Sequence, residues 1–323
     1  MVINVKKIIS KLNTAESMII LTHINEDPDA LGSSFALAQA MRSIGKKANV
    51  CVSGKIEKRL DFMGSDYEIY NPNKTYDYDL CVCVDCGDID RLGERKKVFD
   101  SIGNTISIDH HYSNTYYAGE NYVEGDASSV GQIIYKLLKE MKLTITKEIA
   151  VQLYTAICSD TGCFKYSNVS SETMYAAGEL IGYDINHAEI ARLLFEREPL
   201  WAVELKAEVS SNITSCYDGK LRIVTAEKSL YEKYNIPEED IPNLVDIPRM
   251  IENTEVAVCL KEQADGVRVN LRSNGDFNVS ELAAKFGGGG HKKAAGCTLK
   301  DMSLNKIKEI IIKECSYLSE SRI

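Results

Sequence analysis

The chain has 323 residues, of which 44% are hydrophobic and 26% are charged, and its formal net charge is −9. A chain of this length fills one large domain or two ordinary ones, and it is too apolar for an intrinsically disordered protein. Its negative charge leaves no global basic field for long nucleic acid, so a small anionic substrate would need a local cationic site such as a metal.

The composition also bears on where the protein works. The first ten residues include lysines but lack the apolar core of a signal peptide, and no apolar run approaches the roughly 20 residues of a membrane span. Ten cysteines are scattered along the chain, several in apolar contexts such as "LCVCVDC". We interpret them as reduced thiols and predict a cytoplasmic protein with no membrane partner.

Strand and helix patterns alternate in the first part of the chain, after a short amphipathic helix predicted at 4–13. Strands are predicted at 18–23, 47–54, 80–88 and 105–111, each of which contains a short apolar stretch. Helices are predicted at 30–45, 129–141 and 147–164. This alternation predicts an α/β fold with a doubly wound, mainly parallel sheet, which binds ligands at the carboxyl edge of its strands.

The pattern changes near Arg197, where a connecting helix is predicted at 198–213. A new set of elements follows, with strands at 220–226, 255–263, 266–274 and 294–300, helices at 229–236, 278–286 and from about 304, and a turn at the glycines 287–290. We therefore predict a first domain at 1–197, a linker helix within 198–214 and a second, smaller α/β domain at 215–323, with the active site in the cleft between the domains.

Acidic and histidine residues follow apolar runs at four places in the first domain. They are His23, Asp27 and Asp29; Asp85; Asp109, His110 and His111; and Asp160. Because the carboxyl ends of parallel strands meet at one edge, we expect four carboxylates and at least two imidazoles to lie close together. Unpaired, such a cluster is costly, and divalent cations would neutralise it.

Taken singly, each of these residues has an ordinary structural explanation. An aspartate after a strand more often caps a helix or forms a turn, and His187 is interpreted as a surface or capping residue. Adjacent histidines after Asp109 are harder to explain in this way. Cys81, Cys83 and Cys86 are interpreted as small buried side chains and not as a zinc site, because no second pair lies nearby.

Mixed carboxylate and imidazole ligands suit Mn²⁺, with Mg²⁺, Fe²⁺ and Zn²⁺ as alternatives. The number of carboxylates predicts two metals that share a bridging one. Two metals about 3.5–4 Å apart are a common device for hydrolysing phosphoesters, because they activate a water and stabilise charge on the phosphate.

A second region of interest is 267–297. Arg268, Asn270 and Arg272 alternate with apolar residues, so both guanidinium groups share one strand face. The run "GGGGHKK" follows, and four consecutive glycines predict backbone amides that approach a phosphate closely, with His291 and Arg272 as further donors. The alternative is a flexible loop with a solvated lysine patch.

Together these motifs resemble the DHH phosphoesterase superfamily, named for the triplet found here at Asp109, His110 and His111. "GGGGHKKAAG" resembles the DHH-associated domain that follows in RecJ-like exonucleases and in the shorter NrnA-type bifunctional oligoribonucleases and pAp phosphatases. The resemblance covers nearly the whole chain, with the motifs in the expected order, and the two-domain length is most similar to the NrnA type.

The resemblance implies roles by position. Six residues would hold two metals: His23 and Asp27 one, Asp29 and His110 the other, with Asp85 as the bridge and Asp160 completing the site. His111 would lie near the scissile phosphate as a donor or acid, so the implied catalytic residues are His111 and Asp85. The substrate would be held by Arg272, Gly288, Gly289, Gly290, His291, Arg268 and Arg91.

One residue departs from the family pattern. The family usually has proline just before the first aspartate of this motif, where this chain has Glu26, and Pro28 lies between the two aspartates. Glu26 is not a ligand by its position. We expect its added negative charge to alter metal affinity.

The resemblance implies hydrolysis of di- to tetranucleotides and dephosphorylation of 3′-phosphoadenosine 5′-phosphate (pAp) by a two-metal, bridging-hydroxide mechanism. Mn²⁺ is the expected metal, Mg²⁺ the alternative, and a homodimer is compatible with the sequence. Three other functions stay open: a cyclic or linear dinucleotide phosphodiesterase, a family II inorganic pyrophosphatase, and a catalytically dead nucleotide-binding protein. The pyrophosphatase is disfavoured because its basic Ser-Arg-Lys-Lys-type signature is missing, and the dead protein because every expected ligand is present.

Overall fold

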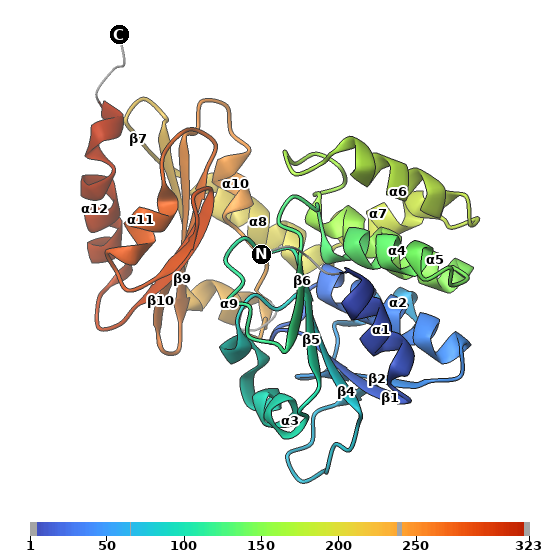
Figure 1. The fold of residues 1–323 in the computed structure, drawn as a ribbon. Helices are drawn as coiled ribbons and strands as arrows, with labels where there is room; N and C mark the ends of the chain where they lie inside the picture. The colour runs from blue at the N-terminus through green and yellow to red at the C-terminus, as the bar shows by residue number, and fades with distance from the viewer. Residues whose placement is uncertain (1–4, 65, 238–240, 320–323) are drawn as a thin grey trace. The chain divides into compact units, whose positions relative to one another are not determined.

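The computed structural model describes residues 5–64, 66–237 and 241–319, and the chain divides into two compact units, Met1–Arg197 and Glu198–Ile323 (Figure 1). Each unit has its own sheet and its own hydrophobic core. Within the described ranges, no helix combines the length and the apolar character that crossing a membrane requires.

The first unit is built on a six-stranded sheet in the order β3-β2-β1-β4-β5-β6, with every neighbouring pair parallel. Its strands are β1 (Ser17–Leu21), β2 (Lys47–Val52), β3 (Tyr67–Ile69), β4 (Leu80–Val84), β5 (Thr105–Asp109) and β6 (Glu120–Val123). β4 and β5 are buried along their whole length, which explains their continuous apolar runs. The predicted parallel α/β fold is confirmed.

The strand order indicates which edge of the sheet is suited to bind a ligand. β1 lies between β2 and β4, so the chain winds outward in both directions from the middle of the sheet. The point where the winding direction changes is where doubly wound sheets bind ligands, beyond the carboxyl ends of the strands. The motif residues follow β1 and β4 and span the end of β5, three adjacent strands that lie on both sides of this point.

Two layers cover this sheet (Figure 1). The helices of the first unit are α1 (Val5–Thr14), α2 (Pro28–Ser43), α3 (Lys96–Ser101), α4 (Val130–Glu140), α5 (Lys147–Asp160), α6 (Ser171–Ile181) and α7 (His187–Phe195), with 3₁₀ turns η1 (Lys58–Met63) and η2 (Ile89–Arg95). One core joins alternate strand residues, such as Ile20 and Val82, to α2, α4 and α5. The other joins Cys81 and Cys83 to α3, so these thiols are packing residues.

Glycines allow α2, α4 and α5 to approach one another closely. A Cβ at Gly32 of α2 would lie 2.4 Å from the carbonyl oxygen of Gln152 in α5. A Cβ at Gly131 of α4 would lie 2.5 Å from the Cβ of Ala156, also in α5. This contact brings the beginnings of α2 and α4 and the end of α5 to the carboxyl edge of the sheet.

The second unit contains a six-stranded sheet in the order β11-β12-β10-β9-β8-β7, antiparallel except for the β8–β9 pair. The strands are β7 (Thr214–Cys216), β8 (Leu221–Ala226), β9 (Val256–Gln263), β10 (Gly266–Ser273), β11 (Gly289–His291) and β12 (Ala294–Leu299). The glycine run was predicted to be a turn. That prediction is wrong for Gly289 and Gly290, which pair with β12 as the edge strand β11.

Helices pack on both faces of this second sheet. They are α8 (Leu200–Ser211), α9 (Lys228–Tyr234), α10 (Asp246–Arg249), α11 (Val279–Ala284) and α12 (Leu304–Glu314), followed by the turn η4 (Ser316–Ser319). α11 and α12 pack on one face. Leu205 and Val209 of α8 are buried against β8 on the other, so the segment expected to be a linker helix contributes to the core of the second unit.

Candidate functional site

His23 is oriented by the backbone that follows β1. Its Nδ1 lies 2.8 Å from the carbonyl oxygen of Ile24, and since a carbonyl only accepts, Nδ1 donates this hydrogen bond and Nε2 is the nitrogen that faces the site. Nε2 lies 3.5 Å from Oδ2 of Asp27 and 3.8 Å from Oδ2 of Asp85. His23 therefore presents a ligand atom to two carboxylates.

Asp27 and Asp29 both serve helix beginnings. Asp27 caps α2, because its Oδ1 accepts a hydrogen bond from the Ala30 amide at 2.9 Å. Asp29 is fully buried and accepts from the amides of Val130 and Gly131 at 2.7 and 2.9 Å, at the beginning of α4. Its position is thus set by two helices at once, before any cation binds.

Asp85 lies at the centre of the cluster. It has a left-handed backbone, with φ of 56°, and its amide donates to Ile108 of β5 at 3.0 Å. Oδ1 is buried and accepts no hydrogen bond from any described residue, although Nε2 of His110 lies 3.7 Å away. Burial, together with the charges of Asp29 and other nearby aspartates, raises the pKa of Asp85 well above its ordinary range.

His110 is held in the same way as His23. Its Nδ1 lies 3.2 Å from the carbonyl oxygen of Ala127, which leaves Nε2 directed at the carboxylates of Asp160, at 3.2 Å, and Asp29, at 4.0 Å. Burial lowers the pKa of His110, but the hydrogen bond that its ring donates to Asp160 and the charge of Asp29 outweigh this effect and raise the pKa to about 9. The imidazole therefore carries a proton unless a cation replaces it.

Asp160 reaches the cluster from a helix. It was grouped with residues expected at strand ends, although a helix was predicted at 147–164; Asp160 is the last residue of that helix, α5. The close packing of α5 on α2 explains how a helix end arrives at this edge. Its carbonyl accepts from the side-chain amide of Asn168 at 3.1 Å, and the same amide donates to Ser128 at 3.0 Å.

Asp109 and His111 form a separate pair beside these ligands. Oδ1 of Asp109 lies 2.7 Å from Nδ1 of His111, and the Asp109 carboxylate also accepts from the His110 amide and the Asn114 side chain. The sequence motif included Asp109 but gave it no role of its own. The structure gives it one, since this buried carboxylate sets the orientation of His111.

The donor set fits divalent cations. Three groups bring their ligand atoms within 4.8 Å of one another: His23, Asp27 and Asp85; Asp29, His110 and Asp160; and Asp85, His110 and His111. Asp85 belongs to two of them, and its buried Oδ1 has no other partner among the described residues. A buried carboxylate without a hydrogen-bond donor is costly, and a cation between the groups removes that cost.

Glu26 turns away from these ligands. Its Oε1 lies 2.9 Å from Nη1 of Arg95, in a pair whose side chains are 8% and 1% exposed. Glu26 also accepts from the amide and the hydroxyl of Ser53, and Arg95 donates to the Cys51 carbonyl at 2.8 Å. The contacts of Glu26 therefore differ from the expectation that its charge acts on the metals. Glu26 instead anchors the loop that carries His23 and Asp27, here called the ligand loop, to the ends of β2 and η2. Nothing in the sequence pattern links Glu26 to Arg95.

Arg91 lies beside the same loop. Its carbonyl accepts from the Ile24 amide at 2.8 Å, next to His23, and its side chain is exposed. The backbone of Arg91 thus helps to fix the His23 loop, and its side chain stays a predicted substrate contact.

The second unit carries a row of polar side chains. Arg272 of β10 pairs with Ala294 of β12, and Ala294 pairs with His291 of β11, so the three residues form one row across three strands. Residues paired directly across antiparallel strands lie on the same face. Arg272 and His291 therefore flank a small alanine, and Arg268 lies on this face at the other end of β10.

The glycines of the run differ in their surroundings. A Cβ at Gly288 would lie 2.2 Å from the Gly296 carbonyl oxygen, and Gly290, with φ of 144°, would place one 2.4 Å from that of Ala294. The close approach of β12 therefore requires glycine at both positions, independently of any contact with a substrate. Gly289 has no described atom within 4 Å of its ideal Cβ position, so it is open to a ligand.

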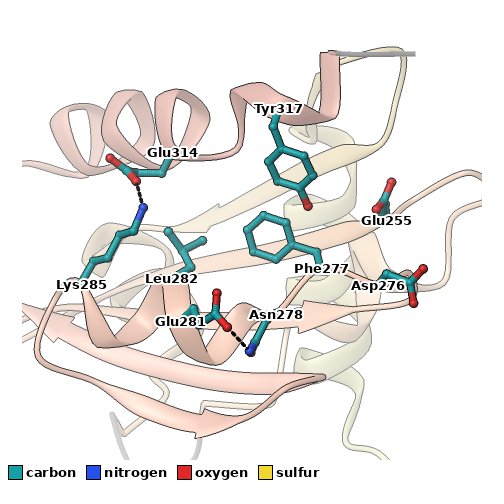
Figure 2. Close-up of a pocket in the computed structure, with 9 residues that line it drawn as sticks. All are labelled: Glu255, Asp276, Phe277, Asn278, Glu281, Leu282, Lys285, Glu314 and Tyr317. Carbon is teal, nitrogen blue, oxygen red and sulfur yellow. Dashed lines mark hydrogen bonds and ion pairs between the residues drawn. The ribbon is translucent and has the colours of Figure 1, made fainter. Parts of the chain in front are cut away.

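A pocket of about 370 Å³ in the second unit lies elsewhere (Figure 2). Phe277 and Tyr317 stack at 5.1 Å in its wall, and Lys285 pairs with Glu314. The remaining charged residues of its lining are acidic: Glu255, Asp276 and Glu281. This lining repels phosphate, and the pocket adjoins α11 and α12, which pack on the opposite face from Arg272.

Comparison with known proteins supports the order of the motifs. The DHH family N-terminal domain matches residues 17–157, and the DHHA1 domain matches residues 223–318. The chain is 32% identical to the bifunctional oligoribonuclease and PAP phosphatase NrnA of Thermus thermophilus, over 91% of this chain and 87% of that protein. It is 29% identical to the protein of the same name from Bacillus subtilis, over 91% and 92%.

A solved structure has the same fold. The exopolyphosphatase-related protein from Bacteroides fragilis superposes with a TM-score of 0.91 at 25% identity, over 97% of this chain and 96% of that one. The match covers both sheets. The chain therefore belongs to the DHH family, in the NrnA-type group that joins a DHH domain to a DHHA1 domain.

Proposed function

We propose that this protein is a metal-dependent phosphoesterase that cleaves di- to tetranucleotides and removes the 3′-phosphate of pAp. The observation that carries the proposal is the position of Asp85, whose buried, unbonded Oδ1 lies among imidazoles and carboxylates from three strand ends and a helix end. The relatives named as oligoribonucleases and PAP phosphatases support this substrate class.

We infer two divalent cations, with Mn²⁺ preferred and Mg²⁺ the alternative, because hard carboxylates and imidazoles are mixed in the donor set. His23 and Asp27 would hold one and Asp29, His110 and Asp160 the other, with Asp85 shared. When bound, such cations activate water and stabilise negative charge on a phosphate. The unpaired thiols agree with a cytoplasmic location.

His111 is the residue for proton transfer in this proposal. Asp109 engages Nδ1, so Nε2 is the ring nitrogen left to contact the phosphate or the leaving oxygen. Because Asp109 holds the ring through Nδ1, Nε2 of His111 is kept in a fixed orientation for proton transfer to the leaving oxygen. Asp109 itself is a positioning residue.

In the proposed division of labour, 1–197 performs the chemistry and 215–323 binds the end of the substrate. Arg272 and His291 lie on one row with only Ala294 between them, which leaves room for a phosphate that both side chains contact. Gly289 and the exposed Arg268 extend this surface. Binding of a terminal phosphate at this surface, here called the phosphate grip, favours short substrates.

The substrate assignment is tested by offering the protein with Mn²⁺ pAp, a 5′-labelled dinucleotide, a 24-nucleotide RNA, cyclic di-AMP and pyrophosphate. We expect turnover of pAp and the dinucleotide and little of the long RNA. Turnover of pyrophosphate alone, or of the cyclic dinucleotide alone, would contradict the proposal.

Replacing Asp109 with asparagine should lower kcat by about 10- to 100-fold, because a carboxylate that orients a reacting imidazole is lost. The asparagine amide can donate to Nδ1 and so favour the wrong tautomer. Bound metal should stay within twofold of the wild-type content. The split between kcat and KM separates this role from a structural one: kcat should fall while KM for pAp stays within about twofold of the wild-type value. A variant with full kcat would exclude the positioning role.

Replacing Arg272 with alanine should raise KM by roughly 10- to 100-fold and change kcat little, since a charge-assisted phosphate contact is worth about 1.5–3 kcal/mol. Steady-state kinetics with pAp measure this. Arg192→Ala, which removes an exposed arginine of α7 paired with Glu189, is the matched control and should leave KM unchanged. An unchanged KM in a folded Arg272→Ala protein would count against the phosphate grip.

A further inference from the structure

Tyr112 is an exposed aromatic residue attached directly to the catalytic motif. It follows His111 in the chain, and 78% of its surface is exposed. Single exposed tyrosines are common on proteins and need no explanation. Tyr112 differs from most of them because its ring is fixed in place.

Two contacts fix the ring. The phenol donates a hydrogen bond to Oδ1 of Asp126, and the ring lies against Gly125. A Cβ at Gly125 would lie 2.5 Å from Cε1 and 2.6 Å from Cδ1 of Tyr112, so any side chain there would displace the ring. The ring is therefore held at its hydroxyl end and along one side, and the rest of it is in solvent.

The segment that supports Tyr112 also supports the candidate metal ligands. Gly125 and Asp126 lie between β6 and α4, and the next residue, Ala127, accepts the hydrogen bond from His110. One residue earlier, the Glu124 amide donates to the carbonyl of Asp109 at 3.0 Å. Tyr112 is thus connected in two ways, through its backbone and through its phenol, to the residues that position His110 and His111.

The charges beside the ring limit what it can bind. Asp126 and Glu124 are acidic and would repel a phosphate placed on this segment. A nucleobase is neutral at physiological pH, and a flat aromatic ring offers it a stacking surface without any positive charge. A fixed, exposed ring on the residue that follows the reacting histidine in the chain offers such a surface.

We propose that Tyr112 stacks on the nucleobase next to the scissile phosphate, and so selects nucleotides over other phosphoesters. This inference rests on the proposed phosphoesterase function and assigns its base-binding position. Stacking is tolerant of base identity, so the four nucleotides should be accepted with similar preference.

The test compares a dinucleotide with its abasic counterpart, which has the same sugars and phosphates but lacks the base. Tyr112→Ala should lower the ratio of kcat/KM for the two substrates by roughly 5- to 150-fold, which corresponds to the usual range for one stacked base. Tyr112→Phe should keep the preference. Tyr175→Ala is the matched control, because Tyr175 is 67% exposed and donates to Glu179 at 3.1 Å, but on α6.

A second readout does not need turnover. The metal-free full-length protein in EDTA is titrated with a dinucleotide carrying 2-aminopurine, whose fluorescence falls when it stacks. We expect quenching with wild type, Tyr112→Phe and Tyr175→Ala, and its loss with Tyr112→Ala. Quenching by a wild-type protein that hydrolyses no substrate would uphold the stacking role and overturn the proposed activity. Equal quenching and an unchanged base preference in Tyr112→Ala would overturn the stacking role alone.

Discussion

Replacing Asp85 with asparagine should lower the rate of phosphoester hydrolysis by about a thousandfold or more. Asp85 belongs both to the group with His23 and Asp27 and to the group with His110 and His111, so its loss is expected to affect both proposed cations. A bound metal contributes several kcal/mol to charge stabilisation, and about 4 kcal/mol corresponds to a thousandfold in rate. The measurement is kcat/KM for pAp and a dinucleotide, together with the metal content of the purified variant.

The matched control is Asp184→Asn, which removes an exposed aspartate that pairs with Lys147. It should keep full activity and metal content. Wild-type activity in Asp85→Asn would rule out the shared-carboxylate site. A partial loss of activity that excess Mn²⁺ reverses would indicate that Asp85 contributes more to metal affinity than to the chemical step.

The same variant should stabilise the protein when metal is removed. Burial raises the pKa of Asp85 and Asp29 well above their ordinary range, so the folded metal-free protein binds protons more tightly than the unfolded chain. The free energy of unfolding of the metal-free protein therefore falls as the pH rises above about 4. His110, whose pKa is raised to about 9, makes this free energy fall further above pH 6.5. Denaturant unfolding in EDTA should show a shallower decline for Asp85→Asn between pH 5 and 9.

Replacing Glu26 with glutamine should lower the free energy of unfolding by about 3–5 kcal/mol, because it leaves the charge of Arg95 buried without a carboxylate to neutralise it. The guanidinium is 1% exposed, and its Nη2 already has no acceptor among the described residues. Chemical denaturation in EDTA measures this without interference from bound metal. The exposed pair of Lys96 and Asp90 is the control, and Asp90→Asn should cost less than about 1 kcal/mol.

A double variant separates charge pairing from packing. Combining Glu26→Gln with Arg95→Met removes both charges, so it should be markedly more stable than the sum of the single variants predicts. Additive losses would show that the two side chains act independently. In that case the anchoring of the ligand loop would rest on Ser53 and the backbone.

The sequence was sufficient for the features that local pattern controls. Continuous apolar runs predicted the central strands β1, β4 and β5, and the acidic and histidine residues after them identified the edge where they meet. The edge strands β3 and β6 were missed because they are short and partly exposed, so they lack an apolar signature. β11 was missed because nothing in a glycine run indicates a strand; its pairing depends on the nearby β12.

The finer parts of the site depend on contacts between distant residues. Asp160 was identified as a candidate ligand within a predicted helix, but its arrival at the sheet edge follows only from the packing of α5 on α2 through Gly32. The pair of Glu26 and Arg95 joins positions 69 residues apart (95 − 26), and no periodic pattern connects them. The role of Asp109 can be assigned only from the direction in which its carboxylate points, and a sequence motif does not specify that direction.

The strand order has a consequence for synthesis of the protein on the ribosome. β1 is made first but lies in the middle of the sheet, and its ligands face partners that are translated later, from Asp85 to Asp160. Asp29 also lacks the amides that hold it until Val130 and Gly131 have emerged. A nascent chain that ends before α5 therefore cannot form the complete donor set, and loading of metal has to follow the release of roughly half of the 323 residues from the exit tunnel.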